Sequence, residues 1–169
     1  MRDEISIERA KKLHPAVRDE VVALIDTVEA NFPANIKVRI VQGLRTIAEQ
    51  DALYAQGRTK PGARVTNAKG GSSYHNYGMA IDVALMYDKD NNGSFETLSW
   101  DINADQDNDK VKDWQEIVKI FEAAGWFWGG KFSSIKDYPH LEKSFGLSVK
   151  ELKRRYDAKM FIDTYVKLK

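Results

Sequence analysis

The stretch "SSYHNYGMAIDVA" (Ser72–Ala84) joins a polar loop to an apolar run, and it guides the interpretation of the rest of the chain. It holds His75, one of three histidines, and seven residues later Asp82 interrupts the apolar run. Apolar side chains alternate from Met79 to Leu85, which predicts a β-strand with Asp82 between two alanines on one face. Such a carboxylate needs a partner, because an unpaired buried charge costs several kcal/mol.

The composition predicts one domain, residues 1–169, without a disulfide or a thiolate site. The chain has 43% hydrophobic residues and no cysteine, which excludes zinc ribbons and thiol catalysis. The net charge of +1 gives no field that favours nucleic acid, and no apolar run approaches the roughly 20 residues of a membrane span. We expect a monomer. The charged start lacks an apolar secretory region, so we predict synthesis in the host cytoplasm without a signal peptide.

Hydrophobic spacing, together with glycines and helix-capping residues, predicts helices and strands along the whole chain. A helix is expected over residues 15–30, a strand over 36–41, and a capping box at Thr46–Glu49 opens a further helix. Residues 57–78 form a long loop, and residues 111–124 a helix. A second capping box at Ser148–Glu151 opens a helix toward Tyr156, and we predict a C-terminal helix over about 157–169 that packs on the domain.

His75, Asp82 and His140 are the candidate metal ligands. Catalytic zinc sites commonly use three protein ligands, and imidazole and carboxylate groups suit that metal. Taken singly, each residue has an ordinary interpretation: a polar loop histidine, a surface histidine, or a strand carboxylate paired with Arg or Lys. The two alanines beside Asp82 and the Gly-Gly-Ser-Ser loop before His75 favour the metal site.

Asp137 lies three residues before His140, and on a straight strand the two would face opposite sides. They converge only if the chain bends, and Tyr138–Pro139 is a plausible place for a bend. In that case Asp137 would lie near a metal site, where a carboxylate can take a proton from water and pass it to a leaving amine.

Three segments together resemble phage and bacterial L-alanyl-D-glutamate peptidases, which are zinc enzymes of the D-alanyl-D-alanine peptidase and Hedgehog superfamily. They are "GLRTIAEQDALYAQGRTKPGARVTNAKGGSSYHNYGMAIDVAL", "WDINADQDNDKVKDWQEI" and "DYPHLE". The similarity runs from about Ile7 to Tyr156. The signature S-x-H-x-x-G-x-A-x-D is matched in full, by Ser73, His75, Gly78, Ala80 and Asp82.

The resemblance implies an α+β fold, with a small antiparallel sheet and flanking helices, and a role for each motif residue. It implies a zinc ion held by His75, Asp82 and His140, with Asp137 as the catalytic base. Arg45 would steady the oxyanion of the scissile carbonyl or a substrate carboxylate, a role that suits a guanidinium. Gln50 and Ser73 would bind substrate.

The function implied is cleavage of the L-Ala–D-Glu bond in the stem peptides of peptidoglycan, the expected partner. The resemblance favours a phage or prophage endolysin that acts on the cell wall after release from the cytoplasm and lyses the cell. Two alternatives stay open. One is a D-alanyl-D-alanine carboxypeptidase on the same fold, and the other is a non-catalytic, zinc-bearing module that binds the wall.

A candidate calcium site lies in "DQDNDKVKDWQE" (residues 105–116). Its spacing matches an EF-hand loop, in which side chains at positions 1, 3, 5, 9 and 12 and the carbonyl at position 7 are ligands. Position 6 holds Lys110 instead of glycine, which puts the sharp turn in doubt. An acidic loop that faces water is the alternative. The candidate ligands are Asp105, Asp107, Asp109, Val111, Asp113 and Glu116.

Overall fold

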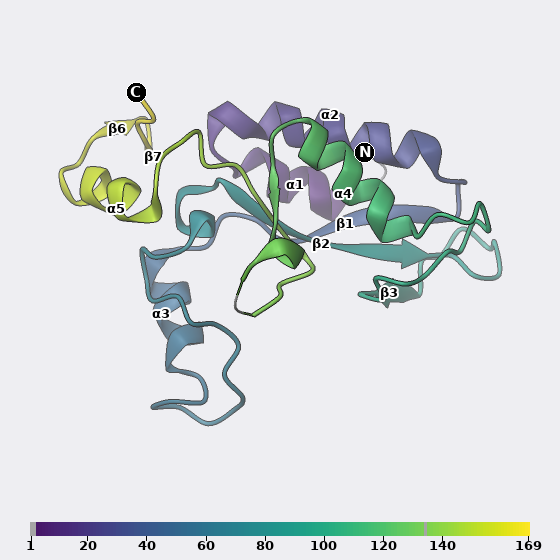
Figure 1. The fold of residues 1–169 in the computed structure, drawn as a ribbon, viewed down its shortest axis with the longest axis horizontal. Helices are drawn as coiled ribbons and strands as arrows, with labels where there is room; N and C mark the ends of the chain where they lie inside the picture. Colours follow the sequence, from purple (N-terminus) through teal and green to yellow (C-terminus); the bar gives the residue numbers. More distant parts are fainter. Residues whose placement is uncertain (1–2, 134) are drawn as a thin grey trace.

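The computed structural model describes residues 3–133 and 135–169, which form helices around a small sheet (Figure 1). The helices are α1 (Glu4–Lys11), α2 (Pro15–Asn31), α3 (Ile47–Ala55), α4 (Asp113–Ala123) and α5 (Val149–Asp157), with 3₁₀ turns η1 (Tyr74–Tyr77) and η2 (Gly129–Lys131). The strands are β1 (Ile36–Gln42), β2 (Ala80–Tyr87), β3 (Thr97–Ser99), β4 (Phe127–Trp128), β5 (His140–Glu142), β6 (Phe161–Ile162) and β7 (Tyr165–Val166). The predicted α+β class is confirmed.

Strand β2 is the centre of the sheet. The order is β1-β2-β5-β4, with β3 also paired to β2, and the strand pairs are antiparallel. In the register between β2 and β5, Asp82 lies opposite His140. Two candidate ligands that are 58 residues apart in the chain are therefore neighbours because of strand pairing.

The main core lies between this sheet and helices α1, α2 and α4, which cover one of its faces in Figure 1. Ile81, Val83 and Leu85 of β2 are almost fully buried there, together with Val21 and Ile25 of α2. Burial of each such side chain contributes roughly 1.5–3 kcal/mol. Because side chains alternate along a strand, this core holds β2 with Asp82 turned to the opposite face.

The C-terminal segment differs from the sequence prediction. Residues 157–169 do not form a helix: α5 ends at Asp157, and β6 and β7 form a hairpin. Its turn begins at Asp163, which has a φ of 53°, a left-handed conformation that Asp tolerates better than most residues. The aromatic and β-branched residues on both sides favour strands. The hairpin packs in a second small core with Tyr77, Met79 and Leu152.

Two further observations complete the fold. Helix α1, which the sequence did not predict, is capped by Asp3, whose carboxylate accepts a hydrogen bond from the Ser6 amide and pairs with Arg39 of β1. None of the helices in residues 3–133 and 135–169 has the length and apolar character needed to cross a membrane.

Candidate metal centre and active site

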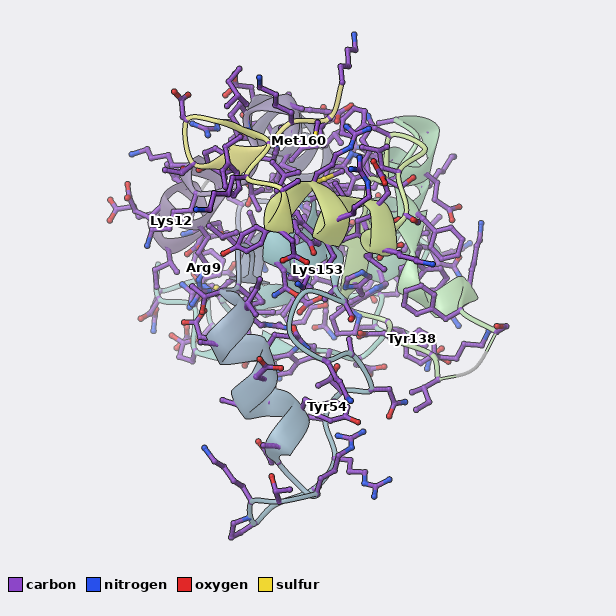
Figure 2. The ribbon with its side chains drawn as sticks, turned by 90° about the vertical axis from the view of Figure 1, so that its left-hand side faces the viewer. Arg9, Lys12, Tyr54, Tyr138, Lys153 and Met160 are labelled. Carbon is purple, nitrogen blue, oxygen red and sulfur yellow. The ribbon has the colours of Figure 1, made fainter. Side chains whose placement is uncertain are left out.

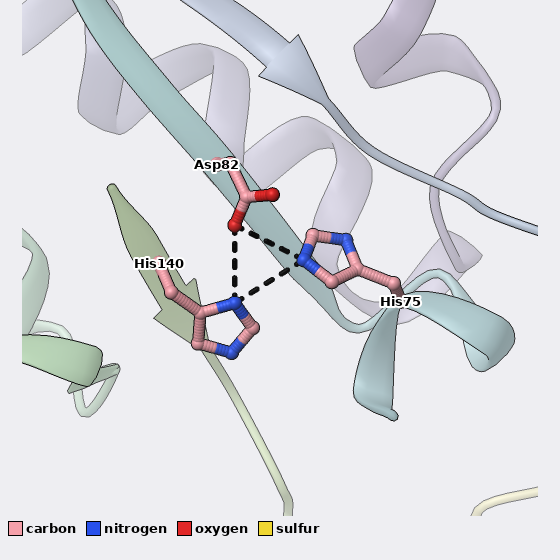
Figure 3. A group of neighbouring side chains, drawn as sticks. All are labelled: His75, Asp82 and His140. Carbon is pink, nitrogen blue, oxygen red and sulfur yellow. Dashed lines mark hydrogen bonds and ion pairs between the residues drawn. The ribbon is translucent and has the colours of Figure 1, made fainter. Parts of the chain in front are cut away.

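His75, Asp82 and His140 converge on one point at the sheet (Figure 3). Asp82 Oδ1 lies 3.1 Å from His75 Nε2 and 3.1 Å from His140 Nδ1, and the two nitrogens are 3.2 Å apart. Both histidines are buried, while the Asp82 side chain is 19% exposed. The sequence prediction brought together the same three residues that the structure places in contact.

The turn η1 places His75. Ser73 caps the turn by accepting a hydrogen bond from the His75 amide, and Gly78 ends it with a φ of 67°. A side chain at Gly78 would have its Cβ 2.7 Å from the His14 amide nitrogen, so only glycine fits between η1 and the start of α2. The His75 carbonyl accepts from the Arg45 amide, which ties this turn to the segment before α3.

A bend at Tyr138–Pro139 places Asp137 beside His140, as the sequence analysis required. The amide of His140 donates to the carbonyl of Asp137 at 3.2 Å, and both residues line the same groove. Gly129 lies against this bend, and a Cβ at that position would collide with the Asp137 carbonyl oxygen. The bend and the glycine together let Asp137 and His140 face the same space.

The outer hydrogen bonds show which ring nitrogen of each histidine faces the centre. His75 Nδ1 lies 2.8 Å from the Gly43 carbonyl oxygen, and His140 Nε2 lies 2.8 Å from Glu142 Oε2. Both oxygens only accept, so these two nitrogens carry the protons. With a metal bound, His75 Nε2 and His140 Nδ1 would direct their lone pairs toward it, whereas in the metal-free chain a proton on His140 Nδ1 is donated to Asp82 Oδ1.

Three ligand atoms this close together need a proton or a metal cation between them. Ligands of a tetrahedral zinc ion with bonds of about 2.0–2.2 Å lie roughly 3.3–3.6 Å apart, close to the 3.1–3.2 Å found between His75 Nε2, Asp82 Oδ1 and His140 Nδ1. Two imidazoles and one carboxylate are a donor set suited to zinc. These three residues therefore fit a zinc ion with three protein ligands.

The electrostatics of the centre agree with this arrangement. Burial raises the pKa of Asp82, but the adjacent His75 and His140 outweigh it and hold that pKa well below its usual range. Burial lowers the pKa of His140, yet hydrogen bonds with Asp82 and Glu142 raise it to about 9. A metal that binds His140 Nδ1 must displace this proton, so metal affinity falls as the pH falls.

Asp137 has the environment of a proton acceptor. Burial and the charge of Asp82 raise its pKa above the usual range, against the opposing effect of His140, His75 and Arg45. Among the residues that the structure describes, none donates a hydrogen bond to its carboxylate, which leaves that group available to water or substrate.

Arg45 lies at the centre, whereas Gln50 lies behind it. Arg45 Nη2 is 3.7 Å from Asp82 Oδ2, and Arg45 Nε is buried without a hydrogen-bond acceptor. Gln50 is fully buried: its Oε1 accepts from Arg45 Nη1, and its Nε2 donates to the Ala68 carbonyl. The expectation that Gln50 binds substrate is therefore corrected, since its side chain supports Arg45 and the adjacent loop instead. Ser73 does line the groove.

A groove of about 870 Å³ leads to the three candidate ligands. Figure 2 shows α5 with Lys153 above α3 with Tyr54, and the segment with Tyr138 to the right. Leu53 of α3, Val149 of α5 and Ile135 line its walls. Ile135 and Val65, at the rim, are 67% and 56% exposed, so the groove opens to solvent there.

Comparison with known proteins places this site in a family. A peptidase M15 family model described as D-alanyl-D-alanine carboxypeptidase matches residues 66–143, which include all three candidate ligands. The chain is 47% identical over 130 residues to the peptidoglycan L-alanyl-D-glutamate endopeptidase CwlK of Bacillus subtilis, a match that covers 77% of this chain and 72% of that protein. The chain belongs to the M15 peptidase family.

A solved structure agrees with the fold of this M15 peptidase. The crystal structure of the Serratia marcescens L-Ala D-Glu endopeptidase ChiX matches with a TM-score of 0.53 at 21% identity, over 84% of this chain and 88% of that one. Zinc dependence is general among M15 peptidases, and the donor set of this centre is consistent with it.

The candidate calcium ligands of the peptidase lie beyond the other end of β2. Donor oxygens of Asp105, Asp107 and Asp113 lie within 4.8 Å of one another, as do those of Asp107, Asp109 and Glu116. Glu116 Oε2 and Asp105 Oδ1 are buried without a hydrogen-bond partner. The Asp113 carboxylate also accepts hydrogen bonds from the Tyr87 hydroxyl and the Gln106 amide.

The sharp turn that Lys110 put in doubt is present. Lys110 has a φ of 76°, and its amide donates to Asp105 Oδ2 at 3.1 Å. Val111, expected to offer its carbonyl, donates its amide to Asp109 Oδ1. Burial and the neighbouring aspartates raise the pKa of Glu116 to about 7.

Sequence reasoning missed the groups that hold the ligands in place. The Gly43 carbonyl behind His75 has no sequence signature. Asn76 is also a support, because it bridges the Gly71 amide and the Arg45 carbonyl. Glu142 lies two residues after His140, and on a strand this spacing predicts that both side chains lie on one face.

Proposed function

We propose that this M15 peptidase is a zinc metallopeptidase that cuts the L-Ala–D-Glu bond of peptidoglycan stem peptides. The observation that carries the proposal is the convergence of three metal-ligating atoms at 3.1–3.2 Å on the floor of a groove that also holds Arg45 and Asp137. The bond is proposed from the 47% identity to an enzyme named for it.

A metal held by His75, Asp82 and His140 would supply Lewis acidity, which can polarise a carbonyl group and lower the pKa of water to near neutral. Asp137 takes the proton from the attacking water and delivers it to the leaving amine of the D-Glu residue. Arg45 donates hydrogen bonds to the carbonyl oxygen as negative charge develops there, or to a carboxylate of the substrate. Gln50 keeps the Arg45 guanidinium in place.

The rival activity is D-alanyl-D-alanine carboxypeptidase, the description of the matched family model. The experiment that separates the two is digestion of purified peptidoglycan with the zinc-loaded protein, followed by mass spectrometry of the new termini. The proposal expects new N-terminal D-Glu-type residues. Release of free D-Ala would replace it with the carboxypeptidase.

The third alternative is a non-catalytic module that binds the wall. It predicts that the protein is retained by peptidoglycan without clearing it in a zymogram. The Asp137 carboxylate lines the same groove as the candidate ligands and accepts no hydrogen bond from residues 3–133 or 135–169, which favours catalysis. Addition of a chelator is the control, because clearing by the proposed enzyme stops when the metal is removed.

The endolysin role is a further proposal, which the resemblance to phage enzymes supports. Expression in a bacterial cytoplasm should leave cells intact until the inner membrane is permeabilised, and then lyse them. The matched control is Asp137→Asn, which should not lyse permeabilised cells. If cells that express the active enzyme stay intact after their inner membrane is permeabilised, the enzyme does not lyse that host.

Calcium binding by the 105–116 loop is also proposed. It is supported by the turn at Lys110 and by the buried, unpaired oxygens of Asp105 and Glu116. Repulsion among the carboxylates would be relieved by a divalent ion. Calorimetric titration of calcium into the zinc-loaded peptidase tests this, with Asp107→Ala and Glu116→Gln as controls, and absence of heat would refute it.

A further inference from the structure

The two histidines of the metal centre are held by different groups. Behind His75 is a neutral backbone carbonyl, that of Gly43, at 2.8 Å. Behind His140 is the carboxylate of Glu142, also at 2.8 Å. A carboxylate is the stronger acceptor, and as the partner of a ligating imidazole it makes the ring a better donor to a metal.

We infer that Glu142 is a positioning residue that fixes the His140 ring with Nδ1 directed at the metal. The inference rests on the proposed zinc function. It gives Glu142 a role through His140 and not through the substrate, and it separates Glu142 from the catalytic base.

The backbone holds Glu142 firmly in this position. Glu142 lies on β5, paired with Ala80 of β2 on one side and with Phe127 of β4 on the other. Residues two apart on a strand face the same side, so the side chains of Glu142 and His140 are neighbours by geometry. The Glu142 side chain is only 17% exposed.

Glu142 has its ion pair with His140 alone, within residues 3–133 and 135–169. The proton on His140 Nε2 is therefore directed to Glu142 Oε2, and the ring cannot turn over without losing this bond. A ring turned by 180° about its Cβ–Cγ bond would place the carbons Cδ2 and Cε1 where Nδ1 and Nε2 now lie, and the Glu142 carboxylate, which is only 17% exposed, would lose its partner at a cost. The hydrogen bond thus selects both the orientation and the tautomer of His140.

Asp137 shows the opposite pattern, which is why the two acids have different roles. No described group donates a hydrogen bond to the Asp137 carboxylate, so it can meet water and substrate. Glu142 already uses one oxygen for His140. A catalytic base must be free to accept a proton in each turnover. A positioning residue must instead keep its hydrogen bond throughout the reaction.

The test measures zinc affinity by competition with a chelator in Glu142→Leu, Glu142→Gln and Asp137→Asn. Loss of an outer partner typically weakens metal binding about 10–100-fold, which is the result expected for Glu142→Leu. Glu142→Gln should lose less zinc affinity than Glu142→Leu, because its amide oxygen still accepts a hydrogen bond from His140 Nε2–H. Asp137→Asn should keep wild-type affinity while losing turnover.

Two further readouts keep the test decisive if Glu142→Leu does not fold. Imidazole ¹⁵N shifts of the zinc-loaded protein should show His140 protonated at Nε2, and Glu142→Gln should keep most of its turnover at saturating zinc with an unchanged KM. Unchanged zinc affinity in a folded Glu142→Leu, or an inactive Glu142→Gln beside an active Asp137→Asn, would overturn the inference. Zinc affinity needs no substrate, so failure of the proposed substrate would leave this result intact.

Discussion

Strand β2 connects two clusters of charged side chains that have opposite electrostatics. Near its start, Asp82 faces two imidazoles and Arg45, and its pKa is held below the usual range. Beyond its end, the carboxylates of the 105–116 loop face one another, and burial together with this repulsion raises the pKa of Glu116 to about 7. The first cluster already contains compensating groups for its carboxylate, whereas the second lacks them.

This difference teaches what each cluster can do. The first is rigid, because each ligand has an outer partner: Gly43 for His75, Arg45 for Asp82 and Glu142 for His140. Such a site is prepared for one metal with fixed geometry. The second is a loop whose turn is formed but whose carboxylates repel one another, and we expect a bound cation to relieve that repulsion.

The largest effect is expected at the first cluster. Asp82→Ala removes the oxygen that both histidines face, so we expect zinc content near zero and no measurable hydrolysis of peptidoglycan. Asp107→Ala in the second cluster should keep one zinc per chain. Elemental analysis of both purified variants makes the comparison, and full zinc occupancy in Asp82→Ala would remove Asp82 from the ligand set.

Replacement of the base should lower turnover without loss of metal. Asp137→Asn keeps the size of the side chain and removes its basicity, so kcat should fall about 10²–10⁴-fold at normal zinc content. An Asn variant with wild-type kcat would require another base.

Zinc removal should reveal the proton on His140. Its folded-state pKa of about 9 lies above the unfolded value of about 6.5, so in stripped protein this stabilisation is complete below pH 6.5 and is lost as the pH rises through 9. The stability gained from zinc should therefore grow over that range. Zinc at 100 times its Kd adds about 2.7 kcal/mol, or roughly 5–10 °C in Tm. Thermal scans at several pH values, with and without chelator, measure the gain, and a gain that shrinks as the pH rises would contradict this account.

Gln50 should matter through Arg45 and not through substrate contact. Gln50→Leu leaves Arg45 Nη1 and the Ala68 carbonyl without their partner, which should cost about 1–3 kcal/mol of stability. We expect kcat to fall by about tenfold as Arg45 loses its position. Chemical denaturation and steady-state kinetics measure the two effects, and a change in KM alone would restore the original prediction of substrate binding.

The smallest effect is expected at the second cluster. Because Glu116 titrates near pH 7, calcium binding at that pH should release protons and weaken as the pH falls toward 5. Glu116→Gln should abolish this proton release. Calorimetry in two buffers of different ionisation enthalpy detects this proton release. Calcium binding that is independent of pH would show that Glu116 is not a calcium ligand.

The sequence predicted those features that depend on local pattern. Alternation around Asp82 placed it on a strand face, and the capping box at Thr46 begins α3 as expected. Ser148 caps α5, but the second half of the predicted box is replaced, because the Glu151 carboxylate pairs with Arg154 and Arg155. The prediction of a C-terminal helix was wrong because the spacing of Phe161, Ile162 and Tyr165 fits a helix as well as a hairpin. The left-handed turn at Asp163 decides in favour of the hairpin.

Features that depend on strand register or on burial could not be predicted in the same way. The Arg45 and Gln50 motif was found, but nothing local indicates that Gln50 faces inward. The choice of Nε2 in His75 and Nδ1 in His140 follows from partners that the fold supplies. The bend at Pro139 was predicted because that residue restricts the backbone around it.

The most direct test of the account uses a defined stem pentapeptide, L-Ala-γ-D-Glu-diamino acid-D-Ala-D-Ala, and the metal-stripped peptidase titrated with zinc. Products are identified by mass spectrometry at each zinc ratio. We predict a single cleavage between L-Ala and D-Glu, with a rate that rises in proportion to zinc and reaches its plateau at about one ion per chain. Release of D-Ala as the first product, or a rate that does not depend on zinc, would contradict the central claim.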